Sequence, residues 1–185
     1  MQAPLRTIFH GLEGTWQLRR SLNSKLLGFP SGTFTGTATF SPSDAFNKSS
    51  YLYHEIGTLT TDQGFQLTAN RKYIYCYSPE DAKLSAWFVK DVDGKDDVDY
   101  LYHELEFHFE HDRWIAKADH LCENDMYWAF YDFRLDAAGD SLLMWGLKHQ
   151  VKGPEKDYSS DTVYTREDQA QATNSASNSL RCMGY

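Results

Sequence analysis

This sequence lacks long apolar runs and paired cysteine motifs. No segment reaches the roughly 20 consecutive apolar residues of a transmembrane helix, and residues 1–14 lack the apolar stretch of a secretory signal. The three cysteines, Cys76, Cys122 and Cys182, are odd in number and show no Cys-x-x-Cys spacing. This cysteine usage favours reduced thiols inside the cell, so we expect a cytoplasmic protein that has no membrane partner.

Basic clusters and nucleotide-binding motifs are also absent. The chain has 18 Lys and Arg against 26 Asp and Glu, which gives a formal net charge of −8. Nucleic acid is therefore not an expected partner, because binding phosphates requires a basic face. The sequence has no glycine-rich phosphate loop, no Gly-x-Gly-x-x-Gly and no Gly-x-Ser-x-Gly turn, which disfavours nucleotide binding and the usual hydrolase chemistry.

Aromatic residues, in contrast, are abundant. They make up 15% of the chain, with 12 Tyr and 11 Phe, which is typical of a protein rich in β-strands. Turn signals containing Gly, Pro, Asp and Ser divide the sequence into about ten expected strands. These strands are predicted at residues 14–22, 32–41, 51–60, 64–77, 83–90, 98–110, 113–122, 126–135, 141–151 and 162–166. Only the first dozen residues indicate a helix.

The strand pattern predicts an all-β fold in a single domain. A sheet of this size avoids exposed edges most simply by closing, so we expect an antiparallel barrel of about 8–10 strands with an internal cavity over residues 1–166. A two-layer sandwich is the alternative, although its interior is usually drier. Residues 167–185 include a stretch rich in Ala, Gln, Ser, Thr and Asn, and we interpret them as a C-terminal tail.

Three predicted strands place a proton-bearing side chain on an apolar face. A strand sends successive side chains to opposite faces, so Arg71, His103 and His120 should each point where their apolar neighbours point. Polar groups that project into an aromatic interior predict a ligand cavity. The faces consist of Phe65, Leu67, Ala69, Tyr73, Tyr75 and Tyr77 with Arg71; Leu101, Leu105, Phe107 and Phe109 with His103; and Trp114, Ala116, Ala118 and Cys122 with His120.

A possible ion pair adds to this interior. Adjacent antiparallel strands can place Glu55 on one strand opposite Arg71 on the next. The guanidinium would keep the buried carboxylate ionised, and the pair could then orient a ligand. An interior salt bridge that fixes strand register explains the same two residues equally well. His149 should also point inward, because it shares a face with Leu143, Trp145, Leu147 and Val151.

These residues suggest roles in acid–base chemistry. Histidine is the natural acid or base near neutral pH, so His120 or His103 is the expected proton carrier. Tyr73 or Tyr127 is expected to donate a hydrogen bond to a carbonyl oxygen of a substrate. A lone histidine on an apolar face is more often a core residue, so a structural role is the alternative for each histidine. The expected ligand-binding residues are Tyr53, Glu55, Arg71, Tyr131, Trp145 and His149.

Metal and cofactor sites are not expected. His103, His108, His111, His120 and Cys122 lie close together in the sequence but match no established zinc spacing. Haem bound through one inward histidine is a lesser alternative. Cys122 is interpreted as a small buried hydrophobe rather than a nucleophile, and the turn at residues 153–158 is interpreted as structural.

The two ends of the strand region carry a family resemblance. Gly14-Thr15-Trp16 opens the first predicted strand, and the last one contains Tyr164 and Arg166. This arrangement resembles the lipocalin and calycin superfamily, in which a Gly-x-Trp opens the barrel. The resemblance implies that Trp16 packs at the closed barrel end against Arg166 in a cation–π contact.

Further motifs extend the resemblance over roughly residues 11–166. They are His120-x-Cys122-x-x-Asp125-x-Tyr127, Phe133, Trp145, Gly153-Pro154-x-Lys156-Asp157-Tyr158 and Tyr164-x-Arg166, preceded by Glu55-x-Gly57, Arg71-x-Tyr73, Asp93-Gly94 and His103. Together they resemble an uncharacterised domain-of-unknown-function family with a lipocalin-like barrel. Glu155 departs from this pattern, in which an arginine is expected, and residues 95–102 form a longer stretch than is typical.

The sequence therefore predicts a protein that binds a small, largely apolar or aromatic organic molecule inside a barrel. Two functional classes fit this prediction. One is a cofactor-independent enzyme that isomerises, cyclises or dehydrates its substrate by acid–base chemistry. The other is a binding or carrier protein, in which the same polar groups only orient the ligand. A protein-interaction module is the least favoured class, because the special residues are expected to point inward.

Overall fold

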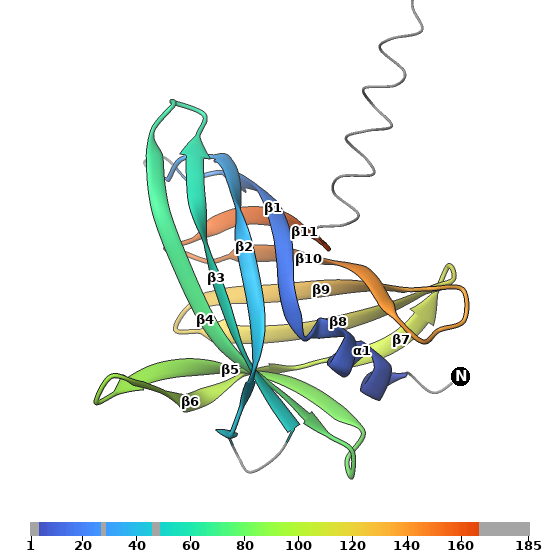
Figure 1. The fold of residues 1–185 in the computed structure, drawn as a ribbon. Helices are drawn as coiled ribbons and strands as arrows, with labels where there is room; N and C mark the ends of the chain where they lie inside the picture. Colours follow the sequence, from blue (N-terminus) through green and yellow to red (C-terminus); the bar gives the residue numbers. More distant parts are fainter. Residues whose placement is uncertain (1–3, 27–28, 46–48, 167–185) are drawn as a thin grey trace, which may run out of the picture.

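The computed structural model describes residues 4–26, 29–45 and 49–166. In this part of the chain, one helix, α1 (Leu5–Leu12), precedes eleven strands (Figure 1). The strands are β1 (Gly14–Ser24), β2 (Gly32–Ser43), β3 (Ser49–Thr61), β4 (Gln66–Ser78), β5 (Lys83–Val92), β6 (Lys95–Glu104), β7 (Glu106–Glu110), β8 (Arg113–Cys122), β9 (Asp125–Leu135), β10 (Leu142–Lys152) and β11 (Asp157–Thr165). The predicted all-β fold and its N-terminal helix are confirmed. The predicted tail at 167–185 lies outside the described residues.

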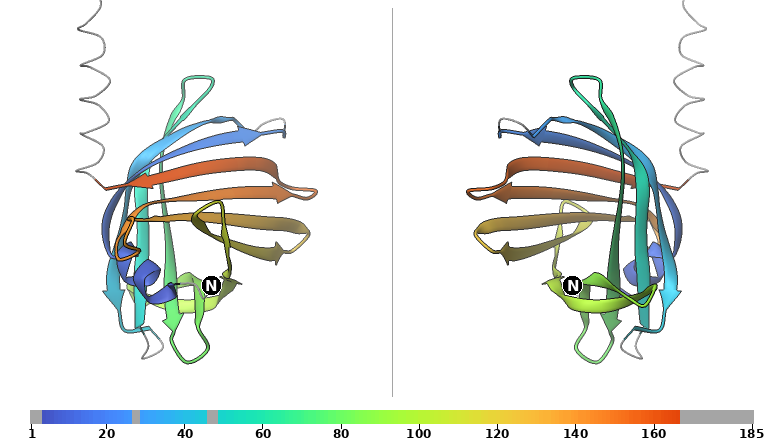
Figure 2. Two further views of the ribbon diagram at one scale, coloured as in Figure 1. Left: turned by 90° about the vertical axis from the view of Figure 1, so that its right-hand side faces the viewer. Right: turned by 90° about the vertical axis from the view of Figure 1, so that its left-hand side faces the viewer.

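All of these strands belong to one antiparallel sheet that curls into a half-barrel (Figure 2). Each strand pairs with the strands before and after it in the chain, except that β6 and β7 do not pair with each other, and β1 also pairs with β11. The two ends of the sheet are therefore β6 and β7, which follow each other in the sequence. The predicted strand at 98–110 is divided between them at Leu105, whose N–H donates to the carbonyl oxygen of Leu84 at 2.9 Å.

Several predicted apolar faces end earlier than the sequence pattern suggests. Phe65 and Leu67 are 66% and 53% exposed, because the β3–β4 hairpin projects beyond the rest of the sheet (Figure 1). Leu101 is exposed where the β5–β6 register shifts, Leu143 is exposed where the β9–β10 register shifts, and Phe109 is exposed on the edge strand β7. A shift of one residue sends a side chain to the opposite face, so strict alternation fails at these irregularities.

Helix α1 closes one end of the half-barrel. Its apolar residues recur at the spacing of a single helical face, and Phe9 stacks on Tyr51 with ring centroids 4.5 Å apart. The indole N–H of Trp16 donates to the last turn of the helix at 2.7 Å. The buried residues of α1 are Leu5, Ile8, Phe9 and Leu12, and the last three join the main core.

Arg166 locks this closed end. Its guanidinium carbon lies 3.8 Å from the ring centroid of Trp16, so the cation–π contact implied by the family resemblance is present. The same guanidinium donates three hydrogen bonds to carbonyl oxygens where α1 runs into β1. These acceptors are Gly11 and Glu13, both at 2.7 Å, and Thr15 at 3.1 Å.

We expect Arg166→Lys to lower the free energy of unfolding by about 1–2 kcal/mol, measured by urea denaturation. Lysine keeps the positive charge but cannot reproduce the planar fork that reaches several carbonyl oxygens at once. Arg19→Lys is the matched control, because Arg19 is exposed on β1. Equal stability of Arg166→Lys and the native protein would contradict this role for the fork.

Candidate ligand-binding cavity

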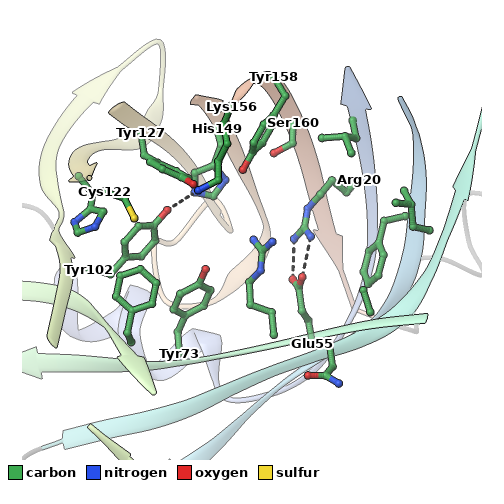
Figure 3. Close-up of a pocket in the computed structure, with 18 of the residues that line it drawn as sticks. Arg20, Glu55, Tyr73, Tyr102, Cys122, Tyr127, His149, Lys156, Tyr158 and Ser160 are labelled. Carbon is green, nitrogen blue, oxygen red and sulfur yellow. Dashed lines mark hydrogen bonds and ion pairs between the residues drawn. The ribbon is translucent and has the colours of Figure 1, made fainter. Parts of the chain in front are cut away.

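A cavity of about 470 Å³ lies on the inner face of the curled sheet (Figure 3), and no residue of α1 lines it. Side chains from every strand except β7 line it. Its apolar wall comes mainly from Leu22, Phe34, Leu59 and Phe88, and five tyrosines add ring faces and hydroxyl groups. These tyrosines are Tyr73, Tyr100, Tyr102, Tyr127 and Tyr158.

The structure divides the sequence-predicted site residues into two groups. Those that line the cavity are Glu55, Arg71, Tyr73, His120, Tyr127 and His149. Those that lie outside its lining, buried in the interior, are Tyr53, His103, Tyr131 and Trp145. We expected all ten in the barrel interior, but a sequence pattern cannot tell which part of each strand belongs to the packed end of the barrel.

Glu55 has a different ion-pair partner from the expected one. It stands opposite Arg71 in the β3–β4 register, as predicted. Both of its carboxylate oxygens, however, accept hydrogen bonds from Arg20 on β1, at 2.8 and 2.7 Å (Figure 3). The expected Glu55–Arg71 pair is therefore corrected to Glu55–Arg20. The sequence does indicate that Arg20 points inward, because it lies on the same face of β1 as the buried residues Trp16 and Leu18.

Gly57 leaves room for the aromatic ring that lies beneath Arg20. Gly36 and Gly57 face each other in the β2–β3 register, next to the ion pair on the inner face. The ring of Phe34 lies over Gly57, where an added Cβ would come within 2.8 Å of the ring. This ring supports Arg20, whose guanidinium carbon lies 5.3 Å from the ring centroid. Because Gly57 has no side chain, the ring of Phe34 has room to lie beneath Arg20.

The ion pair belongs to a buried polar network. Arg20 also donates to the hydroxyl of Thr162 at 2.8 Å, while Tyr53 donates to Glu55 and lies 3.0 Å from the hydroxyl of Tyr164. Burial acts to raise the pKa of Glu55, but the hydrogen bonds and charge of Arg20 outweigh it and hold this pKa below its ordinary value. Glu55 is therefore ionised at neutral pH, and both of its oxygens accept hydrogen bonds from within the protein.

His149 is held at the cavity wall by Tyr102. The Tyr102 hydroxyl lies 3.1 Å from Nε2 of His149 (Figure 3). Burial, followed by the nearby charge of Arg71, lowers the pKa of His149 to about 3. Burial likewise lowers the pKa of His103 to about 3, and this ring contacts the Tyr131 hydroxyl at 2.8 Å. Both imidazoles are therefore neutral at pH 7.

His120 lies at the seam between the two ends of the sheet. Its ring centroid is 5.6 Å from that of Phe88, 6.2 Å from Tyr100 and 5.3 Å from Tyr102. These ring contacts join β8 to β5 and β6, with which it shares no backbone ladder. His120 is only partly buried, unlike His149, so it is the cavity histidine that solvent and ligand can both reach.

The turn between β10 and β11 supplies two cavity residues that the sequence interpretation treated as structural. Asp125 accepts backbone N–H groups from Glu155 and Lys156, at 3.1 and 3.3 Å, and so fixes the turn. The turn then presents Lys156 and Tyr158 to the cavity (Figure 3). The Lys156 ammonium lies 5.5 Å from the ring centroid of Tyr127 and 3.6 Å from Oδ2 of Asp125.

Residues 12–166 match one protein family, described as a family of unknown function (DUF6314). The chain belongs to this family. The matched region of DUF6314 contains every strand described above and all of the cavity residues. No curated protein matches the chain. The DUF6314 description assigns no chemistry, so the functional argument depends on the cavity itself.

Two further observations concern the described part of the chain. None of its helices is long and apolar enough to cross a membrane. Its His, Cys, Asp and Glu side chains form no group of three that could hold a metal ion.

We expect Arg20→Met to lower the free energy of unfolding by about 3–5 kcal/mol at pH 7, because it leaves the Glu55 carboxylate buried without its counter-ion. The stabilisation from ionised Glu55 is fully present above its unfolded pKa, about 4.5, and is lost as pH falls through its lower folded pKa. The unpaired carboxyl of the variant takes up a proton more readily. The difference in free energy of unfolding between the native protein and Arg20→Met should therefore be smaller at pH 3 than at pH 7.

Urea denaturation at several pH values measures this difference. Lys72→Met is the control, because it breaks an exposed pair with Asp96 and should cost less than about 1 kcal/mol. A difference for Arg20→Met that is small, or that does not change with pH, would argue against a stabilising buried pair.

Proposed function

We propose that this protein binds a small, largely apolar organic molecule with aromatic character in the cavity. The observation that carries the proposal is an aromatic-lined space of about 470 Å³ with a few polar groups held at fixed positions. Cavities of this size and composition accommodate drug-sized ligands. The closed end at Trp16 and the open end at the cavity also support a lipocalin-like arrangement.

The cavity wall offers a flat surface to an aromatic ligand. The rings of Tyr73 and Tyr102 are stacked, with centroids 5.3 Å apart and an angle of 10° between their planes. Burial raises the pKa of both hydroxyls, so both remain protonated. The Tyr102 hydroxyl contacts His149, which leaves the Tyr73 hydroxyl as the donor offered to a ligand. The contacts of Arg20 and His149 hold their polar groups in place without a ligand, which lowers the entropic cost of binding.

A second proposed function is acid–base catalysis at His120. Its partly exposed imidazole lies beside the hydroxyl-bearing rings of Tyr102 and Tyr127, at centroid distances of 5.3 and 6.4 Å. In such a reaction His120 would take a proton from one substrate atom and return it to another, while Tyr73 or Tyr127 donates to a carbonyl oxygen. His103 and His149 are poor candidates for this step, because their neutral rings bind a proton weakly.

We expect Ala69→Trp to weaken binding of the neutral dye Nile red at least tenfold, because the indole would fill the cavity beside Arg71. Fluorescence titration measures this affinity, and thermal unfolding checks that the variant is folded. Thr68→Trp is the matched control, because the adjacent side chain points to the other face of β4. Equal loss in both variants, or no loss in either, would count against binding in this cavity.

The catalytic function is tested by comparing the small molecules that co-purify with two forms of the protein. If His120 transfers protons, His120→Phe should retain a molecule that differs from the one bound to the native protein, because conversion stops while the cavity remains. Native mass spectrometry followed by extraction identifies both molecules. The same molecule in both forms would support a carrier.

A further inference from the structure

The charges inside the cavity do not balance. Four of the side chains that line it carry full charges at neutral pH: Arg20, Glu55, Arg71 and Lys156. Glu55 is the one carboxylate among the lining residues that the structure describes, and both of its oxygens are bound to Arg20. The cavity thus has an excess of positive charge in a chain whose net charge is −8.

Arg71 is the cation that lacks a counter-ion. Lys156 has Asp125 at 3.6 Å, outside the cavity lining. Across residues 4–26, 29–45 and 49–166, no carboxylate forms an ion pair with Arg71. The hydroxyl of Tyr73 and, to a smaller extent, the charge of Glu55 raise the pKa of Arg71 against the opposing effect of burial, which keeps Arg71 charged.

Arg71 and Lys156 act on the same region of the cavity from opposite walls. Arg71 comes from β4, whereas Lys156 and Tyr158 come from the turn between β10 and β11 and from the start of β11. Burial and Tyr127 raise the pKa of Tyr158, and the charges of Arg71 and Lys156 both oppose that rise. The Tyr158 hydroxyl therefore lies within the field of both cations.

We propose that the ligand is an aromatic acid whose carboxylate binds Arg71, with Lys156 and the Tyr158 hydroxyl on the opposite wall. This inference depends on the proposed binding function. A planar guanidinium matches a carboxylate with two parallel hydrogen bonds. A neutral ligand would remove water from Arg71 without replacing it by a counter-ion, which costs free energy. An acid is therefore preferred for two reasons: its carboxylate is attracted to Arg71, and a neutral analogue would desolvate Arg71 without a compensating contact.

The position of Arg71 also orients the ligand. Solvent reaches Arg71, Ala69 and Asn70, whereas Tyr102 and His149 are buried. The carboxylate would then lie toward solvent, and the aromatic rings would extend toward Tyr102.

Competition with Nile red tests this assignment. The probes are 9-anthracenecarboxylic acid and its methyl ester, which share a ring system and differ in charge. The native protein should bind the acid at least about tenfold more tightly than the ester, as expected for one charge-assisted contact. Arg71→Gln should abolish most of this preference, whereas the exposed control Arg19→Gln should retain it. Arg71→Lys, which keeps the charge without the fork, should retain part of it.

The outcomes separate the two proposals. Equal affinity of the native protein for acid and ester would overturn the assignment of an acidic ligand but leave cavity binding intact. A preference that survives in Arg71→Gln would overturn the role of Arg71. Absence of Nile red binding and of any binding of either probe by calorimetry would overturn the proposed binding function itself.

Discussion

The buried ion pair between Arg20 and Glu55 determines how the barrel interior is divided. It links β1 to β3 across β2, and the contact of Arg20 with Thr162 extends the link to β11. On one side of this pair the interior is filled by aromatic side chains, including Trp16 and Trp145. On the other side it is open. Separating two buried opposite charges is costly, because each would be left without a partner away from water. The ion pair therefore fixes the position of the boundary between core and cavity.

The same boundary separates two kinds of polar residue. Buried tyrosines such as Tyr53 and Tyr164 satisfy one another and the ion pair within the packed half. In the cavity, Arg71 and His120 face solvent and are available to a ligand. A histidine or tyrosine in this protein is therefore informative about function only when its depth in the barrel is known.

Much of the fold could be predicted from the sequence, because two-residue periodicity directly encodes which side chains share a face. That periodicity also gave the Glu55–Arg71 register and the inward position of His120. It could not reveal Arg20 as the partner of Glu55, since their contact joins strands that are not adjacent in the sheet. Tyr102 was missed because bulges in the β5–β6 pair change the phase of β6.

The seam at His120 has a mechanical consequence. Neighbouring strands elsewhere in the sheet are joined by backbone ladders, but the wall between β6 and β8 is closed by aromatic contacts. The energy of each ring contact is small and varies gradually with distance. Separating two paired strands, in contrast, requires breaking backbone hydrogen bonds. We therefore expect the circumference of the half-barrel to adjust more easily along this line than across a backbone ladder. Ligands of different girth would be accommodated there, while the opposite wall keeps its shape.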